Sequence, residues 1–559
     1  MIASGPQPGP ADAPARAWLG RGLLGAAAVV LIVHSLAYNF ITDDAYISFV
    51  FSRNLAEHGQ LAFNLGSPVE GYTNFLWTFV LGVLMLAGIP PEWSSRVLGT
   101  GCALVTLYVV FRTTERALGR PSPWAAVPSL LLACSSGFAC WTSGGLETQL
   151  YTMLFALALD ALVAAASERR ALRRVGIALA LASMTRPEGP MIAAVFGAVW
   201  LAVAVWNARA SRSEPVERPA AGGRFRDELI AVGWFVALWA PWFAWRWWYY
   251  GWPFPNTYYV KATGRWVGAD MPRQLIDNGL YYVWSWLRQT RLVYALPVAL
   301  VGLVAVRART PRFLLAAACA AFAAVYLAYT VMVGGDFMGL HRFIMPMFVT
   351  AALAVTLGAE WLAGRLARLA PRRASAIAAA LAVALVGGFA VTQVGLTRAS
   401  LRWGNFANDR GIDTPAFLIV YTEDRAAIGR AMAGCFRPDD FSIVGGAGAQ
   451  PYLGRMRAID VFGLVSETIA HDEPRIRPRA GHTKFGSEPV LAAYDPTFVF
   501  SCYAIHRQPA APALPCAGFW LARGFEQVTM HIPGMREQGE YYTFLAKRSR
   551  DFQCPGRVR

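Results

Sequence analysis

Two adjacent carboxylates, Asp43 and Asp44, stand at the end of an apolar run that begins near residue 21. Charged groups at the edge of a bilayer are costly unless they are paired or face water, so an ionisable group in this place is a functional candidate by default. Two neighbouring acids need not point the same way, and they make a poor helix cap. A carboxylate at a membrane surface suits a general base, which removes the proton of an attacking hydroxyl group. We therefore treat the pair as candidate catalytic residues.

Cations, acids and amides in later segments are predicted to lie on the same side of the membrane. A cation near a lipid headgroup stabilises the negative charge on a departing phosphate, whereas acids, amides and tyrosines can orient a sugar or an acceptor. Each residue alone has a simpler explanation as a snorkelling anchor, a helix cap or a helix break, but their gathering on one face favours function. The candidate phosphate ligands are Arg186, Lys261, His341 and Arg342, and the candidate sugar or acceptor ligands are Glu70, Tyr72, Asn74, Glu147, Asn256 and Asp336.

The composition places these residues in a polytopic membrane protein. The chain has 559 residues, of which 55% are hydrophobic and 15% are charged, and its mean hydropathy is +0.37. These values lie far outside the range of a soluble protein of this size. The net charge of +16 comes mostly from arginines clustered between apolar runs. We interpret it as a topology signal and not as a nucleic-acid surface.

Eleven runs are long and apolar enough to be candidate membrane spans. A further run at 74–89 is short and is followed by Pro90 and Pro91, so it is either a twelfth span or a helix at the interface. The eleven candidates are 21–41, 94–112, 124–142, 147–167, 172–185, 188–206, 229–249, 292–306, 313–333, 343–363 and 375–394.

The arginines decide how the run at 74–89 is placed. With eleven spans, every second connection carries a basic cluster and the loops between them carry far fewer basic residues. A span at 74–89 would put the later clusters outside, against the positive-inside rule. The sequence therefore predicts a cytoplasmic N-terminus and an exterior tail, and the long first run with no short signal core before it predicts no cleavable signal. The clusters lie at 16–21, 112–120, 169–174, 209–226, 307–312 and 365–373.

The chain is predicted to have two domains, a transmembrane catalytic domain at 1–395 with its first exterior loop at 43–93, and an exterior domain at 396–559. The second part is more polar, and its alternating runs predict strands that lead into turns or helices, which indicates a small α/β domain. Its GGAGAQP stretch fits no nucleotide-binding loop, because the spacing is wrong and Pro451 would break the following helix. We interpret that stretch as a strand-to-helix turn.

Four of the eight cysteines lie in this second part. An exterior compartment permits one or two disulfides there, with the pairing left open. The other four lie within predicted spans and are interpreted as small packing residues. No cysteine has the spacing of a zinc site. The cysteines of the second part are Cys435, Cys502, Cys516 and Cys554.

Several segments resemble a known family. The stretch TDDAYISFVFSRNLAEHGQLAFNLGSPVEGYTNFLW is similar to the first exterior loop of the GT-C glycosyltransferase superfamily, and within it to the cell-wall arabinofuranosyltransferases that use decaprenylphosphoryl arabinose. LETQLY, TRPEG, PNTYYVK and GGDFMGLHRFIMP are similar in the same order, and GAGAQPYLGRMRAIDVFGLVSETIAH resembles the exterior tail of that branch. The motifs specify the superfamily more than the sugar, because relatives with similar motifs move mannose or other sugars.

The resemblance implies a GT-C fold of about eleven transmembrane helices and roles for single residues. Asp43 would be the general base, and Asp44 would bind the acceptor or tune that base. Arg186, Lys261 and Arg342 would contact the lipid phosphate. Some distant relatives bind a divalent metal near this acid, so a metal is possible here although no cofactor is certain.

The predicted function is transfer of a pentose, with arabinofuranose as the leading candidate, from a polyprenyl phosphate to an exterior glycan or glycoprotein. The implied location is a bacterial inner membrane, and no nucleic acid is involved. Ser466 and Glu467 replace an Asn-Asp pair of the family, which puts tail contacts with the acceptor in doubt. Mannosyl or aminoarabinose transferases of the same fold are alternatives. A lipid-linked sugar transporter or flippase is the alternative from another class, but transporters tend to have internal repeats, and none is evident.

Overall fold

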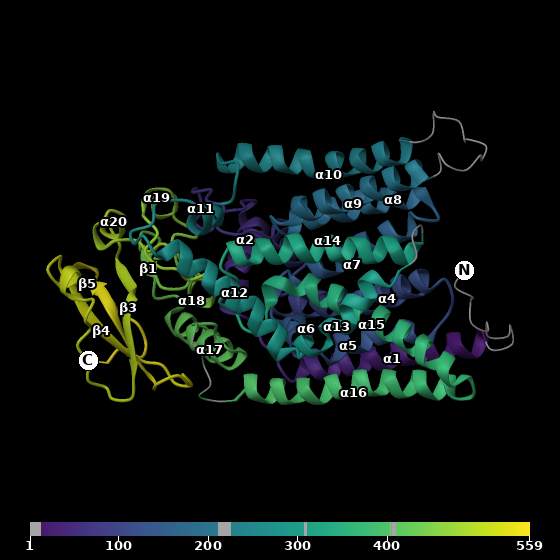
Figure 1. Ribbon diagram of the computed structural model, residues 1–559. Coiled ribbons are helices and arrows are strands. Elements are labelled where there is room, and N and C mark those ends of the chain that lie inside the picture. Colours follow the sequence, from purple (N-terminus) through teal and green to yellow (C-terminus); the bar gives the residue numbers. More distant parts are fainter. Residues whose placement is uncertain (1–12, 211–224, 307–309, 403, 405–409, 559) are drawn as a thin grey trace.

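The computed structural model describes residues 13–210, 225–306, 310–402, 404 and 410–558. The basic segments at 211–224 and 307–309, parts of two predicted clusters, lie outside the described residues. Up to residue 400 the chain forms a bundle of helices that run side by side (Figure 1). The sheet of the C-terminal domain lies beyond one end of this bundle, and α1 (Ala13–Leu36) begins at the opposite end.

Seven helices of the described chain are long and apolar enough to cross a membrane. Two helix pairs that bend sharply at a short break raise this number to nine if each pair is one span: α5 (Val127–Cys134) with α6 (Ser136–Ser143), bent by 64°, and α12 (Met271–Gln289) with α13 (Leu292–Val304), bent by 89°. The seven are α1, α4 (Pro91–Leu118), α9 (Gly189–Ala210), α10 (Arg226–Tyr250), α14 (Pro311–Met332), α15 (Met345–Leu369) and α16 (Ala374–Ser400).

All eleven predicted spans are largely helical, but those at 124–142 and 292–306 form parts of the two bent pairs, and two others are single helices shorter than a membrane requires. The helices α7 (Thr148–Ala164) and α8 (Leu172–Thr185) have 17 and 14 residues. At 1.5 Å per residue they are about 26 Å and about 21 Å long, against a hydrocarbon core of about 30 Å. The run at 74–89 forms α3 (Phe75–Leu86), whose 12 residues are also too few to cross.

The first span ends earlier than its hydropathy suggested. Helix α1 stops at Leu36 instead of continuing to residue 41, and a turn follows in which Asn39 has a φ of 33°. A second helix, α2 (Asp43–His58), begins at the acid pair. Ten of its residues are buried, among them Phe49 and Phe51. The apolar run at 21–41 therefore predicted one continuous span, whereas the chain turns after Leu36 and then starts a second helix.

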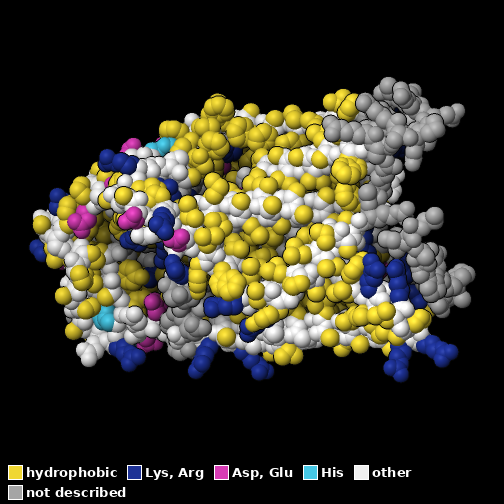
Figure 2. Space-filling view, in the orientation of Figure 1, with side chains coloured by type: hydrophobic (Ala, Val, Ile, Leu, Met, Phe, Trp, Pro, Cys, Tyr) yellow, Lys and Arg dark blue, Asp and Glu magenta, His cyan; other side chains and the backbone are white. Residues whose placement is uncertain are grey.

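The surface of the bundle agrees with a membrane location. Hydrophobic side chains cover its middle in Figure 2, and the acidic side chains visible in that view gather on the end that carries the C-terminal domain. Some basic residues of the opposite end form buried or half-buried ion pairs, such as Arg116 Nε with Asp160 Oδ1 at 3.1 Å and Arg312 Nη1 with Glu360 Oε2 at 2.8 Å. Part of the arginine pattern, predicted as a topology signal, thus also stabilises the helix ends.

The C-terminal domain has a five-stranded sheet in the order β2-β1-β3-β5-β4. Strand β1 pairs in parallel with β2 and β3, and β5 pairs antiparallel with β3 and β4. This mixed sheet confirms the predicted α/β domain, and the GGAGAQP stretch forms the predicted turn between β1 and α18. The elements are α17 (Pro415–Met432), β1 (Ser442–Val444), α18 (Ala449–Gly454), β2 (Ala458–Asp460), α19 (Glu467–Asp472), α20 (Glu488–Ala492), β3 (Phe498–His506), α21 (Gly518–Leu521), β4 (Phe525–His531) and β5 (Tyr541–Lys547).

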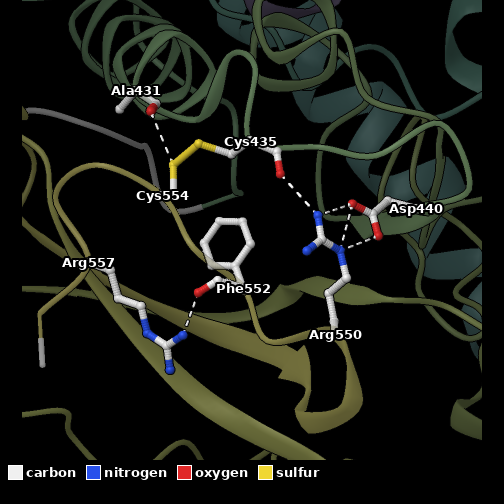
Figure 3. The surroundings of a disulfide bond; sticks show 7 residues. All are labelled: Ala431, Cys435, Asp440, Arg550, Phe552, Cys554 and Arg557. Carbon is white, nitrogen blue, oxygen red and sulfur yellow. Dashed lines mark hydrogen bonds and ion pairs between the residues drawn. A yellow bond between two sulfur atoms is a disulfide. The ribbon is translucent and has the colours of Figure 1, made fainter.

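Two disulfides join the four cysteines of this domain. Cys502 pairs with Cys516, and Cys435 pairs with Cys554, 119 positions later. Figure 3 shows the second bridge between the end of α17 and the C-terminal segment, beside the ion pair of Arg550 with Asp440. The prediction of one or two bridges is confirmed, and the pairing is now defined.

Candidate active site

The end of the bundle that faces the C-terminal domain holds the charged residues predicted for the site. They come from the start of α2, the start of α7, the turn between α8 and α9, the short helix α11 (Asn256–Ala262) and the loop before α15. We call one group of them the charged cluster: Asp44, Glu147, Arg186, Glu188, Lys261, Asp336 and Arg342. Its members interact electrostatically with one another, so the predicted convergence is real for these residues.

Asp44 is the open carboxylate of the cluster. Its side chain is half-buried, and no hydrogen bond or ion pair is found for it within the described chain. Burial raises its pKa, and the positive charges of Arg342 and Lys261 oppose that rise. An acid without a protein partner, next to two cations, is available to accept a proton from a substrate.

Lys261 and Arg342 supply positive charge with free donors. The residue Lys261 is exposed, and its ammonium group has no partner among the residues described. Arg342 binds Asp336 Oδ2 through Nε at 3.1 Å, and its two terminal nitrogens have no hydrogen bond to any described residue. The other carboxylate oxygen of Asp336 accepts the Phe337 N–H at 2.9 Å. This arrangement leaves donors of both cations for an anionic group such as a phosphate.

The C-terminal domain holds the segment that carries Lys261. Arg475 Nη2 donates to the carbonyl oxygen of Lys261 at 2.8 Å, and Thr483 Oγ1 donates to that of Val260 at 2.6 Å. The end of α11 is therefore fixed by residues more than 200 positions away in the sequence. Sequence patterns within α11 alone carried no sign of these contacts.

Arg186 has a different environment from the one predicted. Its Nη1 binds Glu147 Oε1 at 2.8 Å, and its Nε and Nη2 bind the two oxygens of Glu188 at 3.1 and 3.2 Å. Asn74 Nδ2 donates to the second oxygen of Glu147 at 2.9 Å. The guanidinium thus neutralises two buried acids. Its geometry suits the orientation of Glu147 better than the predicted contact with a phosphate.

His341 is neutral in this setting. Its Nε2 lies 2.8 Å from Ser285 Oγ, and burial lowers its pKa to about 3. A neutral imidazole brings no positive charge to a phosphate. The predicted phosphate contact of His341 is therefore limited to hydrogen bonding.

Glu70, Tyr72 and Asn256, predicted to bind a sugar or acceptor, are instead bound to the protein. Glu70 forms a two-pronged ion pair with Arg246, with the shortest contact at 2.6 Å, and both side chains are almost fully buried. The hydroxyl of Tyr72 lies 3.0 Å from that of Tyr250. The amide of Asn256 donates to the carbonyl oxygens of residues 463, 464 and 466. These contacts fasten the first loop to α10, and α11 to the C-terminal domain.

Asp43 is less open than its neighbour. It is 7% exposed, and its Oδ1 accepts the backbone N–H of Ala449 at 2.8 Å. Burial raises its pKa to about 6, although the Ala449 N–H and the charge of Arg425 favour the ionised form. The glycines of the GGAGAQP turn were an unused sequence signal for this contact.

The predicted possibility of a metal finds no ligand set. In the part of the chain that the structure describes, no three His, Cys, Asp or Glu side chains are placed to hold a metal ion. The acids of the charged cluster face arginines instead.

An apolar cavity of about 350 Å³ lies between α5, α12, α13, α15 and α16. Trp286 and Phe348, whose rings are 5.7 Å apart, form part of its wall. Ser285, next to Trp286, is the residue that contacts His341. Arg291 is the one charged residue of the described lining, and its guanidinium has no hydrogen-bond partner in the described chain.

No protein-family model matches the chain, and no curated protein matches it. Its fold is similar to two crystal structures of ArnT from Cupriavidus metallidurans, one bound to undecaprenyl phosphate and one in the apo state. The first has a TM-score of 0.52 at 15% identity and covers 94% of this chain and 98% of the ArnT chain. The second has a TM-score of 0.50 at 14% identity and covers 94% and 97%.

At these identities the likeness shows the fold. The chain has an ArnT-like fold, that of a polytopic helical membrane protein with a C-terminal sheet domain, and the predicted fold class is confirmed. Both neighbours are ArnT. The predicted arabinofuranosyltransferase branch therefore gains no support from them.

Proposed function

We propose that this protein is a membrane glycosyltransferase that takes a sugar from a polyprenyl phosphate and transfers it to a hydroxyl group of an exterior acceptor. One observation carries the proposal: the carboxylate of Asp44 lies in one cluster with Lys261 and Arg342, and among the described residues it has no partner and both cations have unused donors. The fold shared with ArnT, whose crystal structure holds undecaprenyl phosphate, supports a lipid-linked donor.

In the proposed reaction, the acceptor hydroxyl attacks the anomeric carbon of the donor. The new C–O bond forms as the bond between that carbon and the phosphate oxygen breaks, and the hydroxyl proton passes to Asp44. The departing polyprenyl phosphate gains one negative charge, which Lys261 and Arg342 stabilise. Glu147, held by Arg186 and Asn74, is oriented to contact a hydroxyl of the sugar or acceptor.

We assign the base role to Asp44 in place of Asp43, which the family resemblance favoured. A general base must reach the proton that it removes. Asp43 is buried, and its Oδ1 accepts a hydrogen bond from the Ala449 N–H. Asp44 is half-buried, and its carboxylate has no hydrogen-bond partner among the described residues. Asp43 then acts as a positioning residue for the start of α2.

The sugar is proposed to be a pentose. The motif resemblance supports arabinofuranose, and the ArnT-like fold keeps an aminoarabinose donor as the second candidate. The acceptor is proposed to be a glycan or a glycosylated protein. Both candidates use the same cluster, so comparison of the two donors under identical conditions separates them.

The carrier chain is proposed to occupy the apolar cavity. The cavity lies one residue away from the Ser285–His341 contact and is lined almost wholly by apolar side chains. Arg291 could bind an anionic headgroup at the same site. A long isoprenoid chain there would hold its phosphate end near the reacting groups.

The reaction is proposed to take place on the exterior side, with the N-terminus in the cytoplasm. The arginine pattern supports this orientation through the positive-inside rule. The two disulfides of the C-terminal domain support it independently, because such bonds persist in oxidising compartments.

The proposal is tested with purified protein in liposomes, synthetic polyprenyl-phosphate arabinofuranose, aminoarabinose and mannose donors, and an arabinan oligosaccharide as the acceptor probe. We expect one pentose donor to yield polyprenyl phosphate and an extended oligosaccharide, and Asp44→Asn to abolish both products. Wild-type turnover in Asp44→Asn would remove this residue as the base. Movement of the donor lipid between leaflets with no product would favour the transporter alternative.

A further inference from the structure

The turn at 446–449 of the C-terminal domain touches the first acid of α2. The contact joins Ala449 to Asp43, residues 406 positions apart in the sequence. We infer that this turn, which we call the latch loop, is a positioning device that sets the place of α2 and therefore of Asp44 in the reaction centre. The inference rests on the proposed function and extends it, because the C-terminal domain then contributes to the geometry of catalysis.

The fit between the latch loop and α2 leaves no room for a side chain at Gly446 or Gly448. A Cβ atom on Gly448 would lie 2.1 Å from the backbone oxygen of Asp43 and 2.4 Å from its Cγ. A Cβ atom on Gly446 would lie 2.9 Å from Asp43 Oδ2 and 2.9 Å from the hydroxyl of Tyr421. Gly448 has a φ of −92°, so it is required for close approach and not for a left-handed backbone.

The segment after the latch loop continues the same contact along α2. Tyr452 of α18 packs its ring 5.3 Å from that of Tyr46 and 6.0 Å from that of Phe49. Arg53 Nη1 donates to the carbonyl oxygen of Tyr452 at 2.6 Å. These contacts extend from Tyr46 to Arg53, or about two helical turns. The C-terminal domain thus fixes both the start and the direction of the helix that carries Asp44.

The position of Asp44 depends on this contact because the two acids are adjacent in the first turn of α2. A displacement of the start of the helix moves Asp44 relative to Lys261 and Arg342, which belong to other elements. A misplacement of about 1 Å in a reacting group can lower turnover on the order of 100-fold. The latch loop therefore acts on turnover more than on donor binding.

Substitution of the glycines tests the inference, with a matched control in the same turn. A Cβ atom on Gly445 meets nothing within 4 Å, whereas one on Gly448 meets backbone atoms of α2. We expect Gly448→Ala to lower kcat on the order of 100-fold, with donor KM changed less than about threefold, and Gly445→Ala to match the wild type. Equal kcat values for the two variants would overturn the inference.

Substitution of Asp43 provides a second test from the side of α2. The amide oxygen of Asp43→Asn can still accept the Ala449 N–H, but Asp43→Ala cannot. We expect Asp43→Asn to lose about threefold in kcat and Asp43→Ala on the order of 100-fold. If both variants were equally inactive, a charge at Asp43 would be required and the positioning role would be wrong.

Hydrogen exchange separates failure of the latch from failure of the proposed function. In the intact protein we expect the amides of 446–452 to exchange faster in Asp43→Ala than in Asp43→Asn or the wild type. This readout needs no substrate. Unchanged exchange in Asp43→Ala would overturn the latch even if transfer is confirmed, and faster exchange would support it even if every donor tested is inactive.

Discussion

The ion pair between Glu70 and Arg246 allows a test of whether Glu70 stabilises the fold or binds substrate. Glu70 lies in the first loop and was a predicted sugar or acceptor ligand, whereas Arg246 lies near the end of α10. Three contacts of 2.6 to 3.0 Å join the two side chains, which are 5% and 3% exposed. The perturbation is Glu70→Gln, which keeps the shape of the side chain and removes its charge.

The expected loss of stability follows from the burial of the pair. Removal of one partner from a buried ion pair costs about 3 to 5 kcal/mol, because it leaves an uncompensated charge away from water. Glutamine keeps one acceptor oxygen, and Arg246 keeps its bond to the Pro253 carbonyl oxygen at 2.8 Å, so we expect the lower end, about 3 kcal/mol. The exposed pair of Arg455 with Glu57 is the control, and its loss costs at most about 1 kcal/mol.

The assay is thermal unfolding of the detergent-solubilised protein, together with turnover of the folded fraction. We expect the fall in Tm for Glu70→Gln to be at least about three times that for Glu57→Gln, with little change in turnover. The double variant Glu70→Gln with Arg246→Gln should regain part of the loss, because no lone charge remains. Normal stability with a raised acceptor KM would refute the structural role and restore the predicted binding role of Glu70.

Three further predictions concern the cavity, the pH profile and the disulfides. Gly388 lines the apolar cavity, so Gly388→Phe places a ring in it. Gly387 is not part of the lining, so Gly387→Phe is the control. We expect only the first to raise KM, by roughly fivefold, the equivalent of about one buried methylene, for a long-chain donor and not for a short-chain donor. Because burial raises the pKa of Asp44, and the base acts only when ionised, kcat/KM should fall as pH falls, with a midpoint above the ordinary value of 3.8. A flat profile down to about pH 4 would contradict the assignment of the base. Cys554→Ser, which opens the longer loop, should lower the free energy of unfolding more than Cys516→Ser, by ~4.7 against ~3 kcal/mol, and the reverse order would contradict this expectation.

The helices and the second domain were predictable because their signals are local. Each apolar run is helical, and the alternating runs and turn residues of the C-terminal part indicated a mixed domain with disulfides. Helix ends were less predictable. The end of α1 at Leu36 depends on a turn that places Asp43 against Ala449 of another domain. Hydropathy, which averages over neighbours in sequence, contains no information on such a contact.

The members of the site were predicted better than their roles. Asp44, Glu147, Lys261, Asp336 and Arg342 do share one cluster. The roles depend on which cation meets which acid, and those pairings join residues far apart in the sequence. Arg246, the partner of Glu70, stands 176 positions later in a helix that otherwise reads as a membrane span. Sequence spacing therefore placed charged groups on one face without showing which of them the protein had already neutralised.

The charge balance of the cluster gives a physical reason for its composition in the proposed reaction. It contains four carboxylates and three cations, and the neutral His341 adds no charge. A sugar linked to a lipid through a phosphodiester brings one further negative charge, which becomes about two on the released phosphate monoester. Asp44 loses its charge when it takes the acceptor proton, at the moment the phosphate gains one. The total charge of cluster and substrate is then unchanged through the step. No new net charge has to form in a site of low dielectric constant, where it would be unfavourable. A neutral glutamine or asparagine in place of Asp44 would not only remove the base but also leave the developing phosphate charge without this compensation.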